Sequence, residues 1–547
     1  MTEGKKEGVG VALILVTVTL GVHRSALSGF FRWDDAQLIL HALNHPGLDY
    51  FFVPEAWREL SASNLTPWVT LSFGFDLGLF GMAPAAFYFH QLIALWLVAF
   101  GGFYLLRLWA GTGWALLGSM LFLCGAPAAI SSQQLMTRHY VEGLFFASMA
   151  LLFFVRSVRD GDGRLAWLGG FFYLLSVVAK EVYVPLVVLL VFLPEGRIRG
   201  RIVAALPFLL VAVFYVPWRY HMLGALAGGY GGGAAAVDWG AVLRTFSGFA
   251  RLLYGKGGWL VLLVWVVVLF FAMARGKGLL RTVSVALPLL LLPLVPLVKF
   301  PGIYLPGRYL LLPAFAFTCV FVYCLAAFHR RCHHMHCGKA WPLLACLWVP
   351  VLVVSFGHAQ ATVKKLQVAA DAFDVQGRFV WTGKKETRFI PSPQVMAGFW
   401  SVSGLREIRA KIEGGASPVA ILDDRDLAGF AGRVYRYDAD CRCMADITDS
   451  VPEILAQWEK KQGDRPLSVV FENKGGVISW AFGPYAKGQY QLVAETFGRY
   501  TLPVCGSRRA KLKSLSFYIR YDAPDGWVTY SPRLFVDPDG PPVKWER

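Results

Sequence analysis

Residues 9–22 read VGVALILVTVTLGV, and this uncharged run is the first of many along the chain. Similar runs at 87–106 and 259–274 approach or match the length that a helix needs to cross a bilayer. Only 16% of the 547 residues are charged, whereas an ordinary soluble protein has about 25%. The sequence therefore predicts a polytopic α-helical membrane protein.

Hydropathy predicts about eleven membrane spans. They cover residues 9–30, 86–107, 112–130, 140–156, 165–180, 182–195, 202–218, 257–274, 281–298, 309–328 and 341–357. The fifth and sixth spans are short and closely joined, so either could be merged or broken. We expect residues 1–357 to form the transmembrane domain.

Basic residues in the short loops predict the orientation of these spans. Lys5 and Lys6 indicate a cytoplasmic N-terminus, and alternating spans then place the basic clusters at 156–164, 197–201, 275–281 and 330–339 in the cytoplasm as well. The net charge of +17 is thereby explained largely by loop charge, so we expect no nucleic-acid binding. In this topology the tail lies outside the cytoplasm, and we expect a bacterial inner (plasma) membrane location with a periplasmic tail.

Two of the segments that face outward in this topology are long. The first external loop covers residues 31–85 and contains a semi-apolar stretch at 68–80 that predicts a helix along the membrane interface. The second is the tail, residues 358–547, which is long enough to form its own core. Apolar and polar residues alternate in this tail between Gly, Pro and Asp turns, which is typical of half-buried strands. The expected strands are 418–423, 467–473, 477–482, 490–495, 514–521 and 527–536. We predict a soluble β-rich or α+β domain.

The nine cysteines favour structural roles over a metal site. A disulfide from Cys505 to Cys441 or Cys443 is plausible in an extracytoplasmic domain. The His- and Cys-rich run at 329–337 matches no standard zinc spacing, and we interpret it as a basic anchor loop.

The candidate site begins with Trp33-Asp34-Asp35, where the first apolar segment leaves the membrane. Ionised side chains beside a bilayer are costly unless water, a partner or a ligand compensates them. Basic residues at the predicted outer ends of spans run against the usual orientation rule, and a bound anion would explain them. These outer span ends carry Arg138, Lys180 with Glu181, and Arg308 with Tyr309. The alternative is a solvated acidic loop with snorkelling side chains and internal ion pairs, including Lys180 with Glu181.

These stretches resemble motifs of the GT-C superfamily of integral-membrane glycosyltransferases. Phe31-Arg32-Trp33-Asp34-Asp35 is similar to the first external loop of the protein O-mannosyltransferase (glycosyltransferase family 39) group and of transmembrane-and-tetratricopeptide-type mannosyltransferases. The stretch 66–73 resembles the loop helix of that group, 179–181 its S-K-E element, and 306–313 its R-Y-x-x-x-P element. The H-P-x-x-x-E element and the tetratricopeptide repeats of these families are absent from the chain.

The resemblance implies an inverting transfer of a sugar from a polyprenyl-phosphate donor to an acceptor hydroxyl on protein or glycan, outside the cytoplasm. Asp34 or Asp35 would be the general base, and Asp34 is favoured by its place in the motif. Arg138, Lys180 and Arg308 would hold the lipid phosphate, with Glu181 and Tyr309 beside them. A divalent cation, Mg or Mn, is possible in the family, and no cofactor is certain.

Three alternatives stay open at this point. A transferase of the same fold could modify lipid A or a polysaccharide. A transporter or flippase would require ionisable residues near the bilayer midplane and paired interrupted helices. A membrane-anchored scaffold that presents the tail domain would leave the acidic pair unexplained.

Overall fold

A computed structural model describes residues 3–61, 63–226, 240, 249–261, 263–264, 266, 282, 286, 305–334, 340–475, 477–509 and 514–547. The chain divides into two compact units. The helical unit comprises Met1–Gly29 and His41–Gln367, and the C-terminal unit comprises Phe30–Leu40 and Val368–Arg547. The C-terminal unit thus includes the acidic motif together with the tail, and a transmembrane domain ending at residue 357 stays a prediction.

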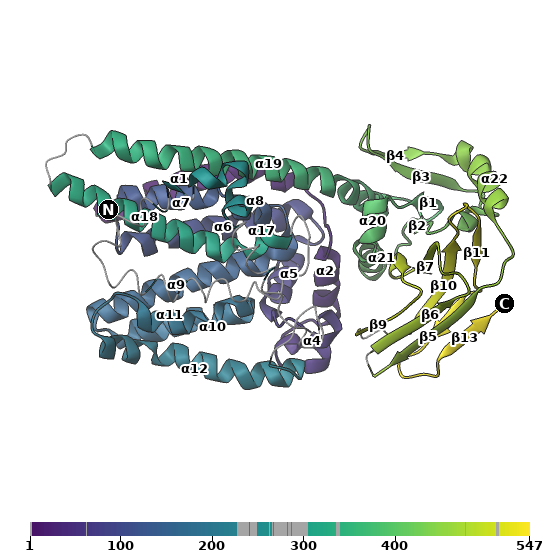
Figure 1. Ribbon diagram of the computed structural model, residues 1–547. Coiled ribbons are helices and arrows are strands. Elements are labelled where there is room, and N and C mark those ends of the chain that lie inside the picture. Colours follow the sequence, from purple (N-terminus) through teal and green to yellow (C-terminus); the bar gives the residue numbers. More distant parts are fainter. Residues whose placement is uncertain are drawn as a thin grey trace. The chain divides into compact units, whose positions relative to one another are not determined.

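Among its described residues, the helical unit contains five helices that are long and apolar enough to cross a membrane, or up to six if a bent pair counts as one span. The five candidate spans are Lys6–Ser28, Pro84–Arg107, Leu135–Asp160, Ile198–Leu223 and Leu311–Arg330. They contain or overlap the helices α1 (Glu3–His23), α6 (Pro84–Arg107), α9 (Arg138–Asp160), α12 (Ile198–Leu223) and α18 (Leu311–His334) (Figure 1). The bent pair is α7 (Thr112–Leu123) and α8 (Ala126–Ser132), which meet at 57°. By length and composition of these helices, the chain is an integral membrane protein.

The predicted number of spans is only partly tested by the structure. The predicted spans at 165–180 and 182–195 correspond to the shorter apolar helices Gly163–Ala179 (α10) and Glu181–Phe192. The predicted span at 281–298 and most of that at 257–274 lie outside the described residues. A long helix, α19 (Ala340–Thr382), begins where the last span was predicted. A total of eleven therefore stays a prediction.

A helix also forms in the first loop, where the sequence predicted one at 68–80. It is α5 (Pro67–Phe80), which follows the N-cap residue Thr66 and has proline at its first position. Proline suits this position because its fixed φ and missing N–H cost nothing there. The helix is therefore confirmed, and its location at the membrane interface stays a prediction.

Small residues let neighbouring helices of this unit approach closely. A Cβ on Gly169 of α10 would lie 2.8 Å from the Phe208 ring of α12, and one on Gly170 would lie 2.6 Å from Pro207. Both distances are shorter than normal carbon contacts. Glycine at these positions therefore permits the packing of α10 against α12, as small residues commonly do between membrane helices (Figure 1).

The C-terminal unit begins with a small α/β layer. Its sheet has the order β2-β1-β3-β4, in which β1 pairs with β2 and β3 in parallel and β3 pairs with β4 antiparallel (Figure 1). The strands are β1 (Thr387–Ile390), β2 (Val419–Ala420), β3 (Arg433–Asp438) and β4 (Cys443–Asp446), and the helices are α20 (Pro393–Ala397), α21 (Trp400–Glu413) and α22 (Val451–Lys461). The parallel pairing requires long crossover connections, and α20 and α21 lie in the connection from β1 to β2.

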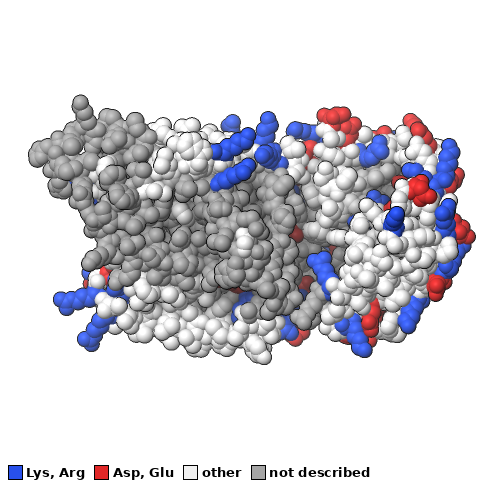
Figure 2. All heavy atoms as spheres, viewed as in Figure 1, with Lys and Arg blue, Asp and Glu red and all other residues white. Residues whose placement is uncertain are grey.

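Two further antiparallel sheets complete this unit. One has the order β11-β10-β7-β8 with β12 also paired to β10, and the other has the order β13-β5-β6-β9. The strands are β5 (Ser468–Lys474), β6 (Val477–Gly483), β7 (Gln489–Ala494), β8 (Gly498–Leu502), β9 (Cys505–Arg509), β10 (Leu515–Asp522), β11 (Val528–Tyr530), β12 (Leu534–Val536) and β13 (Val543–Glu546). Phe471 of β5 and Phe517 of β10 meet in the shared core with ring centroids 4.7 Å apart. Basic and acidic side chains are interspersed over the surface of this unit (Figure 2). The predicted β-rich domain is therefore confirmed.

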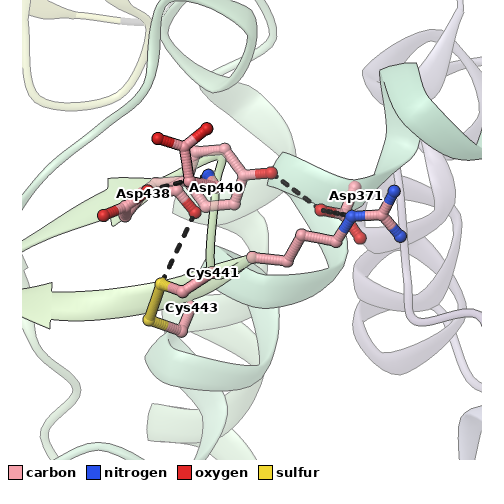
Figure 3. Close-up of a disulfide and its surroundings, with 7 residues drawn as sticks. Asp371, Asp438, Asp440, Cys441 and Cys443 are labelled. Carbon is pink, nitrogen blue, oxygen red and sulfur yellow. Dashed lines mark hydrogen bonds and ion pairs between the residues drawn. A yellow bond between two sulfur atoms is a disulfide. The ribbon is translucent and has the colours of Figure 1, made fainter.

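The disulfide in the C-terminal unit differs from the predicted pairing. Cys441 is bonded to Cys443 at the end of the β3–β4 hairpin, and Cys505 is a free, exposed thiol (Figure 3). Arg442 between the two cysteines has a φ of +51°, which turns the chain within one residue. The two cysteine Cα atoms consequently lie 5.3 Å apart, a normal separation for a disulfide.

Asp424 provides a test of electrostatics in the C-terminal unit. Burial, followed by the negative charge of Asp423, raises the pKa of Asp424 above its ordinary value of 3.8, although Arg520 opposes the shift. The folded state therefore binds the proton more tightly than the unfolded state, and this group lowers stability as the pH rises from 3.8 through the raised pKa. We expect Asp424→Asn to raise the melting temperature of the full-length protein at pH 7, and to lose this benefit below pH 3.8.

The control for this prediction is Asp525→Asn, since Asp525 is an exposed carboxylate of the same unit. Thermal unfolding of both variants over a pH series measures the effect. A melting temperature of Asp424→Asn that changes no more than that of the control would contradict the expected gain.

Candidate functional site

The acidic motif forms a closed turn in front of α2 (Asp35–Asn44). Trp33 has a φ of +46°, an uncommon conformation for a residue with a side chain. The Asp35 backbone N–H donates to the Arg32 carbonyl at 2.9 Å, and the Arg32 N–H donates to Asp35 Oδ2 at the same distance. Asp35 is completely buried by this exchange, whereas Asp34 is half-buried. The turn therefore uses Asp35 as a structural group and leaves Asp34 more accessible.

Arg32, which precedes the acidic pair, forms an ion pair with Asp374 of α19. Arg32 Nε lies 2.5 Å from Asp374 Oδ1, and one terminal nitrogen lies 2.5 Å from Oδ2, so the pair is bidentate. The Phe30 N–H also donates to Asp374 Oδ1 at 3.2 Å. Trp33 packs beside Phe373 with ring centroids 5.9 Å apart. The motif is consequently held on both sides of the strained residue.

Asp34 itself accepts a hydrogen bond from the tail. The indole Nε1–H of Trp400, the first residue of α21, donates to Asp34 Oδ1 at 3.0 Å. Asp374 and Trp400 are 342 and 366 residues from their partners, and no local sequence signal identified either of them. An alignment of related sequences would be the signal able to find such distant pairs.

Arg138 lies at the start of α9, where the sequence placed a candidate phosphate ligand. Its side chain is completely buried, and a terminal nitrogen lies 2.5 Å from Asp76 Oδ2. The other terminal nitrogen donates to the Phe87 carbonyl at 2.7 Å, and the guanidinium lies 4.7 Å from the centre of the Phe73 ring. Because Asp76 already neutralises its charge, this geometry favours a structural role for Arg138.

Lys180 and Arg308 are brought near each other through two tyrosines. Lys180 Nζ lies 5.0 Å from the centre of the Tyr140 ring, and that ring meets Tyr309 edge to face at 5.7 Å. The Arg308 guanidinium lies 5.2 Å from the Tyr309 ring, at the end of α17 (Leu305–Tyr309). We call Lys180, Tyr140, Tyr309 and Arg308 the basic cluster.

The Lys180 ammonium has a particular electrostatic environment. Lys180 is 9% exposed, and among the residues that the structure describes its contact is the Tyr140 ring, without a hydrogen-bonding acceptor or a carboxylate partner. Arg308 and Arg219 lie close enough for their charges to repel it. A buried cation among other cations is costly unless an anion compensates it. The basic cluster is therefore suited to hold a phosphate.

Glu181 forms its ion pair with Arg219. The sequence had left open an ion pair between Glu181 and its neighbour Lys180. The Glu181 carboxylate forms an ion pair with Arg219 of α12 and accepts the Leu65 N–H at 2.8 Å. Arg219 also donates to the Ser63 carbonyl at 3.3 Å. Glu181 therefore ties the first loop to α12 and does not neutralise Lys180.

The described part of the chain contains no group of three or more His, Cys, Asp or Glu side chains that could hold a metal ion. The predicted anchor loop at 329–337 lies partly outside that part. His329, which is described, accepts from the Trp114 Nε1–H at 3.2 Å and belongs to the helix packing. Dependence on Mg or Mn stays a prediction.

No protein-family model matches the chain, and no curated protein matches it. Two of the solved structures that are similar to the chain are of an oligosaccharyltransferase from Archaeoglobus fulgidus. The structure with a tethered acceptor peptide containing the NVT sequon is 11% identical with a TM-score of 0.41, and the match covers 73% of this chain and 63% of the archaeal chain. The complex with Zn and sulfate is 11% identical with a TM-score of 0.42, and the match covers 92% and 73%. Similarity at this level supports no conclusion about the function of this chain.

Proposed function

We propose that this protein is a GT-C-type glycosyltransferase that moves a sugar from a polyprenyl-phosphate donor to an acceptor hydroxyl, with inversion at the anomeric carbon. The observation that carries the proposal is the buried Lys180 ammonium beside Tyr140, which lacks a carboxylate partner among the described residues. The motif resemblance supplies the reaction, and the accessible Asp34 supplies a base.

Each residue then has a defined part in the reaction. Asp34 takes the proton of the acceptor hydroxyl as that oxygen attacks the anomeric carbon. The bond from this carbon to the phosphate oxygen breaks, and the phosphate leaves with the electron pair. Lys180 and Arg308 stabilise the negative charge that develops on the phosphate. Arg138 and Glu181 support the surrounding helices through Asp76 and Arg219.

The direct test is transfer by the purified full-length protein in lipid nanodiscs. Radiolabelled polyprenyl-phosphate sugars serve as donors, and a hydroxyl-bearing peptide, a polysaccharide and lipid A serve as alternative acceptors. Mass analysis of glycoproteins and glycolipids from a deletion strain and its parent identifies the natural acceptor. Label recovered in lipid A or polysaccharide would support the related transferase activity, whereas an absence of transfer together with an unchanged set of glycans would contradict the proposal.

Lys180→Met should weaken donor binding, because methionine keeps the length of the side chain and removes its charge. Loss of a charged hydrogen bond to phosphate should raise the donor KM about 10- to 100-fold. The measurement is initial rate against donor concentration. Lys364→Met is the control, since Lys364 is an exposed lysine of α19. A donor KM for Lys180→Met that equals that of the control would remove Lys180 from the phosphate site.

A further inference from the structure

We infer that Trp400 and the Arg32–Asp374 ion pair are positioning residues for the Asp34 carboxylate. This inference extends the proposed function, because it assumes that Asp34 is the base. All of the contacts involved lie within the C-terminal unit. The tail is accordingly part of the catalytic machinery and more than an attached module.

The first step in the argument is backbone strain at Trp33. A non-glycine residue with φ of +46° lies in a sparsely populated region, and such a conformation persists only where the surrounding structure enforces it. Such residues cluster at functional sites, where strain fixes a side chain in a required place. Trp33 directly precedes Asp34, so its conformation sets the direction in which the Asp34 carboxylate leaves the chain.

The second step is the clamp that enforces this conformation. The Arg32 and Asp374 side chains are 5% and 16% exposed, and both carboxylate oxygens of Asp374 accept from Arg32. A bidentate pair fixes orientation as well as distance. The Phe30 N–H also donates to Asp374. Asp374 therefore holds both Phe30 and Arg32, which precede Trp33 in the chain. On the other side, Asp35 closes the turn onto Arg32.

The third step is the state of the Asp34 carboxylate itself. Its Oδ1 accepts from the Trp400 indole, whereas its Oδ2 has no hydrogen-bond donor among the described residues. An indole N–H only donates, so Trp400 occupies Oδ1 of Asp34 as an acceptor. One oxygen is thus fixed, and the other is available to accept the proton of a substrate hydroxyl.

Trp400→Phe tests the role of this bond, because phenylalanine keeps an aromatic ring and removes the N–H. In full-length protein we expect kcat to fall about 10- to 100-fold with the donor KM unchanged within about twofold. Trp480→Phe is the matched control, because its indole donates to the Pro503 carbonyl at 3.0 Å elsewhere in the same unit.

The clamp is tested by charge exchange. Asp374→Arg and Arg32→Asp should each lower kcat and increase hydrogen–deuterium exchange in the peptide covering residues 30–40. The double variant should recover part of the lost kcat and part of the lost protection from exchange, because it again pairs opposite charges. Exchange that is unchanged in the single variants would overturn the clamp, whether or not the protein shows transfer.

The outcomes separate this inference from the proposed function. Wild-type protein without any transfer would refute the proposed function, and the catalytic part of this inference with it. An inactive Asp34→Asn variant beside a Trp400→Phe variant with wild-type kcat and donor KM would overturn the positioning role alone. A Trp400→Phe variant that loses activity only because it unfolds would have a lower melting temperature, while its rate per folded molecule would equal that of the wild type. That result would also overturn the positioning role.

Discussion

Asp34→Asn is expected to abolish sugar transfer in protein that is otherwise folded. Asparagine has nearly the same shape and can still accept the Trp400 N–H at 3.0 Å, but it cannot take a proton from the acceptor hydroxyl. A positioned general base contributes about 10²- to 10⁴-fold to a rate, so the loss should be at least of this size. Initial rates in nanodiscs with saturating donor measure it, since the defect lies in kcat and not in donor binding.

The matched control is Asp49→Asn, which makes the same change at an exposed carboxylate of the first loop. It should leave the rate within about twofold of wild type, since exposed groups away from a site contribute little. The elution volume and the melting temperature of both variants should equal those of the wild type. Full activity of the Asp34→Asn variant with a defined lipid-linked sugar would exclude Asp34 as the base.

Asp76→Asn is expected to destabilise the helical unit strongly. Asp76 and Arg138 are both completely buried, and their ion pair is the main compensation for two charges removed from water. Breaking a buried pair from one side costs about 3–5 kcal/mol, because the remaining charge is left uncompensated. Asp76 also accepts from His90 Nδ1 at 2.6 Å, and His90 Nε2 lies 3.3 Å from Glu142. Loss of Asp76 would therefore disturb the contacts of α5 with both α6 and α9.

The free energy of unfolding in mixed micelles measures this cost. The double variant Asp76→Asn with Arg138→Met should be more stable than Asp76→Asn alone, since it removes the uncompensated guanidinium. Arg107→Met is the control, because it breaks a pair with Glu7 whose side chains are 38% and 30% exposed, and such pairs contribute about 0–1 kcal/mol. Equal destabilisation by Asp76→Asn and Arg107→Met would show that Arg138 is not held mainly by Asp76.

Much of the fold could be predicted because its signals are local. Uncharged runs of the right length predicted the helices α6, α9, α12 and α18, and period-two alternation predicted the strands β5, β6, β7 and β10. The strands β1, β3, β4, β8, β9 and β13 went unpredicted. Of these, β9 pairs with β6 and β13 with β5, which are not their neighbours in the chain, so no hairpin signal marks them. The predicted pairing of the disulfide was wrong. The feature that decides the pairing is the left-handed backbone of Arg442, which amino-acid composition does not reveal.

The candidate site shows the same division. Its residue types were visible as motifs. Asp34 is more exposed than Asp35, and its role as the base stays a prediction. The sequence did not show which partner neutralises each charged side chain. Arg138 with Asp76 and Glu181 with Arg219 were paired by helix packing, and this packing left Lys180 against the Tyr140 ring.

By itself, the sequence determined that this protein is a membrane protein with a β-rich tail and a set of charged residues that chemistry must explain. Hydropathy and periodicity suffice for that conclusion, because both are patterns among residues that are close together in the sequence. Only the tertiary structure decided which charges are neutralised and which oxygen of Asp34 is held. The reason is physical: the bonds to Asp34 and Arg32 come from residues 366 and 342 positions away, and no local pattern specifies a contact at that distance.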